Sequence, residues 1–172
     1  MMIDIKKYNK IIIIGSGGSG KSTFAKKLGA VIGLPVIHLD NEFWQPGWAP
    51  TPRDEWIEKQ KQFISREKWI IDGNYGGTMD LRFEAAELVV FLDINRFICV
   101  WSAAKRTGKK RSDLPDYLRE PKMFSKDFYE FAKWIWEYPE KDGKAILERH
   151  KCNPDKPFLH IKNRKELEML LS

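Results

Sequence analysis

A glycine-rich run near the start of the chain has the residue types of a phosphate-binding loop. The run Gly15-Ser16-Gly17-Gly18-Ser19-Gly20-Lys21-Ser22-Thr23 matches the pattern G-x-x-x-x-G-K-[ST] without a gap or a substitution. Glycines let a backbone curl so that successive amide N–H groups point at one anion. The positive end of a following helix dipole would face the same point. The run therefore predicts a site for the phosphates of a nucleotide.

Two side chains at the end of this run have separate expected roles. Lys21 is placed to reach the β- and γ-phosphates of a nucleoside triphosphate, and the Ser22 hydroxyl is placed to ligate Mg²⁺ between them. A Gly/Ser-rich turn that merely joins two elements is the alternative. The flanking residues argue against it, because an apolar β-branched run over 10–14 precedes the loop and helical apolar spacing over 22–32 follows it.

A phosphoryl-transfer site also needs a carboxylate close to the metal, usually at the end of a neighbouring strand. Three of the strands that we predict end in aspartate, at Asp40, Asp72 and Asp93. A strand-ending aspartate can instead cap the helix that follows it. Gly73 and Asn74, which follow Asp72, are typical of a site loop rather than of a helix start. The residues alone leave the choice of carboxylate open.

Positive charge over the transferred phosphoryl group is usually delivered by an element that closes over it. The run from Arg106 to Arg111 is basic and contains Gly108 as a hinge. We predict a lid over about residues 106–124, in which Arg106 and Arg111 approach the phosphates and act in catalysis. A solvated charged face and a nucleic-acid patch are the alternatives.

An acceptor site is expected where several loops meet at the carboxyl edge of the sheet. Asp40 is suited to accept or orient the proton of a substrate hydroxyl. Trp44, Asn74 and Arg82 supply an aromatic surface, an amide and a cation, which together suit a small-molecule pocket. Phe43, Trp48 and Tyr75 come from the same loops. The alternative for Trp44 and Trp48 is that they only cover the core.

The elements that position these residues alternate between strand and helix, which predicts an α/β fold with a parallel sheet. We expect strands over about 10–14, 36–40, 69–72, 88–93 and 157–161. Helices are expected over about 22–32, 52–66, 78–86, 95–107, 125–138, 139–150 and 164–171. Residues 41–52 contain glycine and prolines that forbid a long helix. His38 reads as a core residue inside its strand, and no role is predicted for His150 or His160.

Composition sets the limits of these hypotheses. The chain has 172 residues, of which 42% are hydrophobic, and this suits a single domain over 1–172. A net charge of +6 suits a protein that handles polyanions, either nucleotides or nucleic acids. Cys99 and Cys152 are too far apart in sequence for a CxxC pair, so a disulfide framework or a zinc site is not expected. With no secretory signal and no membrane-spanning run, we expect a cytoplasmic monomer or weak dimer.

A set of motifs spread over nearly the whole chain resembles a known group. The phosphate loop is followed by Val36-Ile37-His38-Leu39-Asp40, by Phe43-Trp44-Gln45-Pro46-Gly47-Trp48 and by Trp69-Ile70-Ile71-Asp72-Gly73-Asn74-Tyr75. Leu81-Arg82, Phe91-Leu92-Asp93 and Trp134-Ile135-Trp136 continue the likeness. Together these motifs resemble the topology-modulation (FlaR-type) P-loop proteins, which are related to adenylate kinase and shikimate kinase.

The resemblance implies a three-layer P-loop fold with a five-stranded parallel sheet in the order 2-3-1-4-5 and a helical lid. In that order the third strand lies beside the first, which favours Asp72 as the metal-side carboxylate. Asp72-Gly73 is also similar to the Asp-Gly that opens the monophosphate loop of adenylate kinase. The Phe-Pro-Arg that follows there is replaced by Asn74-Tyr75-Gly76 here, which argues against AMP as the acceptor.

Two functional hypotheses follow. The first is a kinase that uses ATP and Mg²⁺ to phosphorylate a hydroxyl or phosphate of an unidentified nucleoside, nucleotide or metabolite. The second is an ATP-binding or ATP-hydrolysing protein that binds DNA or modulates its topology, which the basic run over 105–111 permits. The sequence contains no helix-turn-helix, zinc or RNA-binding aromatic signature, and the first hypothesis is therefore favoured.

Overall fold

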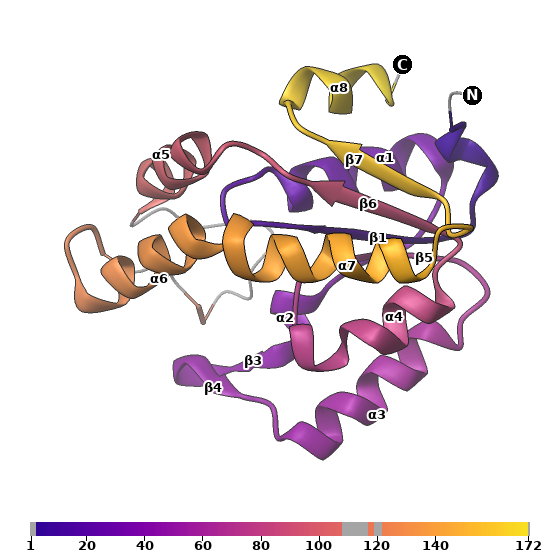
Figure 1. The fold of residues 1–172 in the computed structure, drawn as a ribbon. Helices are drawn as coiled ribbons and strands as arrows, with labels where there is room; N and C mark the ends of the chain where they lie inside the picture. The colour runs from indigo at the N-terminus through magenta and orange to yellow at the C-terminus, as the bar shows by residue number, and fades with distance from the viewer. Residues whose placement is uncertain (1–2, 108–116, 119–121, 172) are drawn as a thin grey trace.

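A parallel five-stranded sheet forms the centre of the molecule (Figure 1). The computed structural model describes residues 3–107, 117–118 and 122–171. The strands of the main sheet are β1 (Lys10–Gly15), β2 (Val36–His38), β5 (Trp69–Asp72), β6 (Leu88–Leu92) and β7 (Phe158–Ile161). Their order is β2-β5-β1-β6-β7, with every neighbouring pair parallel. The predicted order 2-3-1-4-5 is thereby confirmed.

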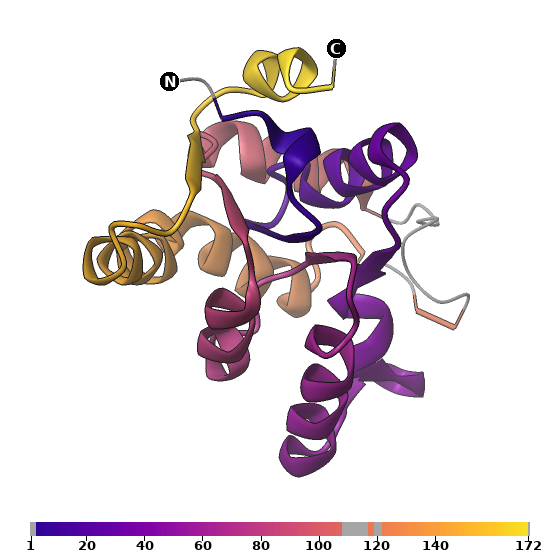
Figure 2. The same cartoon turned by 90° about the vertical axis from the view of Figure 1, so that its right-hand side faces the viewer.

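The central strand β1 is buried on both faces, which explains its unbroken run of isoleucines. Ile11 and Ile13 pack in one core cluster, which includes Phe24 of α1. Ile12 and Ile14 pack in a second cluster on the opposite face. The first face is covered by α1 (Lys21–Ile32), α5 (Arg96–Arg106) and α8 (Arg164–Met169), and the second by α3 (Arg53–Ile64), α4 (Met79–Ala85) and α7 (Lys144–Cys152) (Figures 1 and 2). The fold is a three-layer α/β sandwich.

The second strand is shorter than the sequence predicts. It ends at His38, and a short helix α2 (Leu39–Phe43) begins at the next residue. Asp40 lies in the first turn of this helix, where a carboxylate interacts favourably with the positive end of the helix dipole. Asp40 therefore belongs to a helix rather than to a strand end. His38 is correspondingly the last residue of its strand rather than an interior one.

Residues 41–52 form no long helix, as expected. After α2, the chain makes a two-stranded antiparallel hairpin from β3 (Trp44–Gln45) and β4 (Ala49–Pro50). At its tip Trp48 adopts a left-handed backbone with φ of +60°. A non-glycine residue in this region carries about 1–2 kcal/mol of backbone strain.

The helix predicted over 139–150 divides into two parts. Residues Pro139–Gly143 form one π-helical turn after α6 (Lys126–Glu137), and α7 starts at Lys144. The wide turn is closed by a hydrogen bond of 2.8 Å from the Gly143 N–H to the Tyr138 carbonyl. In the described part of the chain, no helix is long and apolar enough to cross a membrane.

Candidate active site

The loop between β1 and α1 has the structural context that the phosphate-binding pattern requires. It leaves the carboxyl end of the central strand and runs directly into α1, whose first residue is Lys21. Gly15, Gly18 and Gly20 adopt φ values of +155°, +75° and +102°. A Cβ atom at Gly18 would lie 2.2 Å from the carbonyl oxygen of Cys99 in α5. The loop is thus seated so closely on α5 that only glycine fits at this position.

Polar side chains of the loop lie close to its backbone. The Lys21 Nζ donates a hydrogen bond of 3.2 Å to the carbonyl oxygen of Ser16. The hydroxyl oxygens of Ser16 and Ser19 are buried and have no hydrogen-bond partner among the described residues. Ser22 is half-buried and Thr23 is exposed in the first turn of α1. The proposed contacts of these residues with ATP and Mg²⁺ stay predictions.

Asn74 joins the neighbouring loop to the phosphate-binding loop. Its Nδ2 donates a hydrogen bond of 2.8 Å to the Gly15 carbonyl, and its Oδ1 accepts one of 3.1 Å from the Gly15 N–H. The same Oδ1 accepts a second bond, of 3.0 Å, from the Tyr138 hydroxyl. The structure differs here from the predicted role in substrate binding, because the side-chain amide of Asn74 is already engaged with the protein.

Arg82 of α4 is completely buried, with a relative exposure of 0%. Its Nη1 donates hydrogen bonds of 2.8 Å to both Gln60 Oε1 and Thr78 Oγ1, and its Nη2 donates to the carbonyl of Asn74. Burial lowers the pKa of Arg82 to about 9, so the guanidinium keeps its charge at neutral pH. Arg82 holds the loop after β5 from inside, and in this structure it does not face a substrate as the sequence predicts.

The carboxylate of Asp40 is held by a tyrosine. The Tyr75 hydroxyl donates a hydrogen bond of 2.6 Å to Asp40 Oδ1. The Tyr75 ring lies against those of Phe43 and Trp56, with centroids 4.7 and 5.1 Å away. Burial raises the pKa of the Tyr75 phenol far above its ordinary value, and the charge of Asp40 raises it further. Tyr75 is thus a permanent donor to Asp40, which is itself half-buried at the start of α2.

Asp72 ends β5 beside the central strand, opposite Ile13 in the register. Its Oδ2 lies 2.8 Å from His38 Nδ1, and its Oδ1 is buried with no hydrogen-bond partner in the described part of the chain. His38 is therefore a partner of the predicted metal-side aspartate rather than a core residue without chemistry.

The donors near the loop fit Mg²⁺ by chemical type. Hydroxyl and carboxylate oxygens, as on Ser22 and Asp72, are the ligands that Mg²⁺ prefers. Across the described residues, no group of three or more His, Cys, Asp or Glu side chains is arranged to hold a metal ion. An ion that arrives with a nucleotide needs few protein ligands, because phosphates and waters complete its shell. The Oδ1 of Asp72, which has no partner among residues 3–107, 117–118 and 122–171, is an oxygen of the required kind.

The third strand-ending aspartate has a different partner from the one expected. Asp93 follows β6, and its Oδ2 lies 2.8 Å from His160 Nε2 of β7. It does not cap the next helix: Asn95 does, accepting a hydrogen bond of 2.9 Å from the Phe97 N–H. The carboxyl edge of the sheet therefore carries two histidine–aspartate pairs, one on each side of β1.

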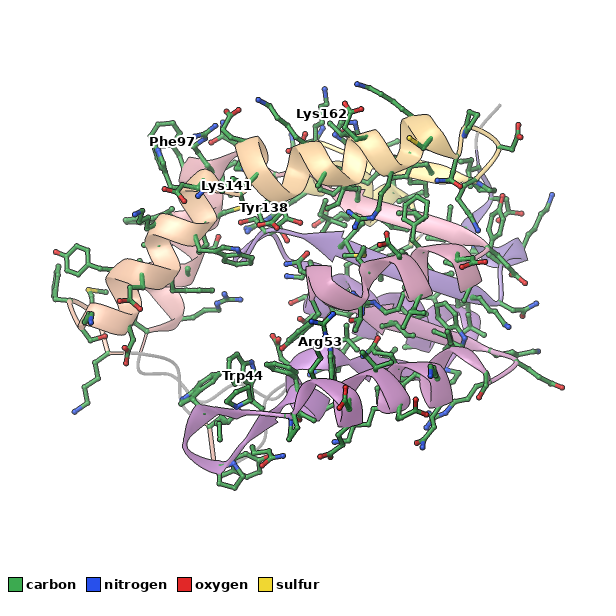
Figure 3. All side chains as sticks on the ribbon, turned by 60° about the horizontal axis from the view of Figure 1, so that its bottom comes forward. Trp44, Arg53, Phe97, Tyr138, Lys141 and Lys162 are labelled. Atoms are coloured by element: carbon green, nitrogen blue, oxygen red, sulfur yellow. The ribbon has the colours of Figure 1, made fainter. Side chains whose placement is uncertain are left out.

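Two tryptophans contact each other in the hairpin that follows α2. Trp44 and Trp48 meet edge to face, with ring centroids 5.5 Å apart, and Trp44 is half-buried. Figure 3 places Trp44 and Arg53 on one side of the open carboxyl edge and Tyr138 across from them. Arg53, the first residue of α3, is exposed and was not among the predicted site residues. The position of Trp44 is compatible with the predicted pocket.

The predicted lid is only partly described. Arg106 is the last residue of α5, and the described residues continue one position further, to Thr107. Arg111 and most of the predicted lid over 106–124 lie outside the described residues. The Tyr117 hydroxyl, within that segment, donates a hydrogen bond of 3.1 Å to the Trp44 carbonyl.

Two further residues support the phosphate loop and were not predicted. Tyr138 acts on it indirectly, through a hydrogen bond to Asn74, which lies 64 positions away from Tyr138 in sequence. Arg164, at the start of α8, donates hydrogen bonds of 2.6 Å to the Gly18 carbonyl and 2.8 Å to Ser102 Oγ. Neither residue belongs to a local pattern, so only the tertiary fold reveals the contact.

Comparison with known proteins identifies the fold. No family model matches the chain, and no curated protein matches it by sequence. The structure is similar to a shikimate kinase from Bacteroides thetaiotaomicron, with a TM-score of 0.57 and 15% identity over 95% of this chain and 94% of that chain. A gluconokinase from Sinorhizobium meliloti gives a TM-score of 0.55 and 16% identity over 95% and 87%. A shikimate kinase from Aquifex aeolicus gives 0.52 and 20% over 94% and 90%.

These similarities span almost the full length of each protein and establish an α/β P-loop kinase fold. At such low identity they show the fold alone. The finer resemblance to the topology-modulation group finds no counterpart among them and stays a prediction.

Proposed function

We propose that this protein is an ATP-dependent kinase that phosphorylates a small hydroxylated molecule. One observation carries the proposal: two consecutive residues join the two halves of the site. Asn74 is bonded to Gly15 of the phosphate loop, and Tyr75 is bonded to Asp40 on the opposite side. A catalytic carboxylate is thereby fixed relative to the place where phosphates would bind, as direct transfer between two substrates requires.

The proposed chemistry assigns each group one task. The acceptor hydroxyl oxygen forms a bond to the γ-phosphorus of ATP while the bond from that phosphorus to the ADP oxygen breaks. Asp40 orients the hydroxyl and takes its proton. Lys21 and the loop amides stabilise negative charge on the phosphates. Bound Mg²⁺, held by Ser22 and near Asp72, would neutralise further charge. Arg106 and Arg111 remain candidates for the same task in a closed lid.

Two features support a small acceptor. The kinases with similar structures are named for shikimate and for gluconate, and both similarities cover nearly the whole chain. Trp44 supplies apolar surface across from Tyr138, and the exposed Arg53 supplies a cation on the same side as Trp44 (Figure 3). We include a cytoplasmic location and kinship with the topology-modulation group in the proposal.

A thermal-shift screen with a panel of nucleosides and metabolites tests the proposal. Each compound is measured with and without a non-hydrolysable ATP analogue and Mg²⁺, because a ligand specific to the folded state raises the melting temperature by mass action. A hydroxylated compound that adds to the nucleotide shift would support a kinase and identify its acceptor class. A shift with the nucleotide alone would favour the alternative of ATP-linked DNA binding.

Two variants separate the halves of the site. Lys21→Met should lose both the nucleotide shift and turnover, and turnover retained by Lys21→Met would contradict the assignment of the loop. Asp40→Asn should keep the nucleotide shift and lose turnover of any acceptor that the screen finds. Asp80→Asn is the matched control, because Asp80 is an exposed aspartate bonded to Arg149 by a contact of 2.6 Å.

A further inference from the structure

The two oxygens of the Asp72 carboxylate have different surroundings. Oδ2 lies 2.8 Å from His38 Nδ1, whereas Oδ1 is buried and accepts no hydrogen bond from any residue that the structure describes. The Asp72 side chain is 4% exposed, and the His38 side chain is 11% exposed. A buried acceptor without a donor costs about 1–3 kcal/mol, and more when it carries charge. Such an oxygen is suited to a cation or to the water shell of one.

The sheet register brings this pair together. His38 and Asp72 are Cα partners at the last rungs of β2 and β5, so their side chains point to the same face. Asp72 is in turn the partner of Ile13, two residues before Gly15. The pair is therefore fixed by backbone pairing to the phosphate loop, without any flexible loop between them.

The hydrogen bond also determines which oxygen is free. An ionised carboxylate only accepts hydrogen bonds, so the proton of the contact is assigned to His38 Nδ1. Because Oδ2 accepts the hydrogen bond from His38, the carboxylate of Asp72 cannot rotate freely, and Oδ1 keeps a fixed orientation. Ligand orientation by a second side chain of this kind changes metal affinity by about 10- to 100-fold in known sites.

We propose that His38 is a positioning residue for divalent metal: its Nδ1–H holds Oδ2 of Asp72 so that Oδ1 remains available to nucleotide-bound Mg²⁺ or its water shell. The proposal rests on the proposed function, since it requires the loop to bind a metal–nucleotide complex. A purely structural role would instead make His38 important for stability and leave the affinity for metal unchanged.

The test measures metal binding rather than turnover. Mn²⁺ replaces Mg²⁺, and its binding to the protein saturated with a non-hydrolysable ATP analogue is followed by electron paramagnetic resonance. His38→Phe keeps a ring and removes the donor, so about a tenfold or larger rise in the Mn²⁺ dissociation constant is expected. Binding of the analogue in the absence of metal should be unchanged. His38→Asn keeps a donor nitrogen at the δ position and should restore affinity close to that of the wild type.

The second histidine–aspartate pair provides a matched control. His160 contacts Asp93 at the same distance, 2.8 Å, on the other side of β1. His160→Phe should leave Mn²⁺ affinity unchanged, and a comparable loss would overturn the assignment of the metal-side carboxylate to Asp72.

The remaining outcomes are also decisive. Wild-type affinity in a folded His38→Phe protein would overturn the role of His38 while leaving the proposed kinase intact. Failure of the wild-type protein to bind the metal–nucleotide complex would overturn both proposals. If His38→Phe does not fold, His38→Leu takes its place beside His38→Asn, because leucine has nearly the size of asparagine and no donor: a tenfold loss in His38→Leu alone supports the positioning role, and equal affinities in the two variants overturn it.

Discussion

The side-chain amide of Asn74 pairs with both backbone groups of Gly15, as a neighbouring strand would. Gly15 is the last residue of β1, and β5 has already ended at Asp72. Asn74 thereby continues the hydrogen bonding between the two strands by one more rung, into the phosphate loop. Tyr138, at the end of α6, donates to the same amide oxygen. One side chain thus connects the phosphate loop to the loop after β5 and to α6.

We predict that Asn74→Ala weakens nucleotide binding and lowers stability together. The substitution leaves the Gly15 N–H, the Gly15 carbonyl and the Tyr138 hydroxyl without their partner, and each buried group left unpaired costs about 1–3 kcal/mol. Urea unfolding and calorimetric titration with the ATP analogue measure the two effects. The control is Asn153→Ala, because Asn153 is exposed and its side-chain amide donates a hydrogen bond of 2.9 Å to the Arg149 carbonyl, far from the phosphate loop in sequence. Unchanged nucleotide affinity in Asn74→Ala would show that Gly15 keeps its conformation without the amide.

A pair of glycines separates backbone strain from steric clash. Gly18 and Gly33 have nearly the same left-handed φ, +75° and +69°. A Cβ at Gly18 would meet the Cys99 carbonyl at 2.2 Å, whereas at Gly33 it would meet nothing within 4 Å. Both alanine variants should lose about 1–2 kcal/mol from the left-handed conformation.

Only Gly18→Ala must also push the loop away from α5, so it should lose further stability and bind the ATP analogue more weakly than Gly33→Ala. Melting temperatures and titration of the two variants compare them directly. Equal losses in both variants would mean that α5 yields to the added methyl group.

The strands and the phosphate loop were predictable because both depend on local patterns, whereas the order of the strands in the sheet came from the family resemblance. Apolar runs over 10–14 and 88–92 are buried on both faces, and the glycine spacing from Gly15 to Gly20 determines a turn by itself. The partners of Asp40, Asp72 and Asn74 were not predictable. Those contacts join residues 34 to 64 positions apart, and sequence spacing carries no information about them.

The case of Arg82 shows why residue type alone misleads. An arginine near a predicted site suggests contact with a charged substrate. Its neighbours in the sequence do not indicate that neutral groups enclose the guanidinium in the folded protein. In the structure its guanidinium is enclosed by Gln60, Thr78 and the carbonyls of the loop after β5. These acceptors come from three elements, so only their packing determines that the cation is internal.

We predict that Arg82→Met destabilises the protein by more than about 3 kcal/mol, because several buried acceptors lose their donors at once. Arg82→Lys should also be destabilising, since one ammonium group cannot replace the planar fork of the guanidinium. Urea unfolding gives both values. Arg66→Met is the control: Arg66 is exposed and should change stability by no more than about 0.5 kcal/mol. A loss below about 1 kcal/mol in Arg82→Met would refute the structural role of Arg82.

The last prediction concerns stability at alkaline pH. Burial raises the pKa of Tyr75 far above the ordinary phenol value of about 10, and the Asp40 carboxylate raises it further. Above pH 10, the unfolded chain therefore releases a proton that the folded protein keeps. Stability from this group is fully present below about pH 10 and is lost as the pH rises, by up to about 1.4 kcal/mol per pH unit.

Tyr75→Phe has no such proton, so its free energy of unfolding should fall less steeply above pH 10 than that of the wild type. Urea unfolding at about pH 9, 10 and 11 gives the free energy of unfolding of the wild type and of Tyr75→Phe as a function of pH. Burial also raises the pKa of Tyr138, but Tyr138 is present in both proteins, so its contribution cancels in the difference between the two slopes. Tyr129→Phe removes an exposed phenol and should keep the wild-type slope. At neutral pH, Tyr75→Phe should also slow turnover, because Asp40 loses the hydrogen bond that orients it. Parallel slopes for Tyr75→Phe and the wild type would mean that the phenol is ionised in the folded protein, and Tyr75 could then not be the permanent donor to Asp40.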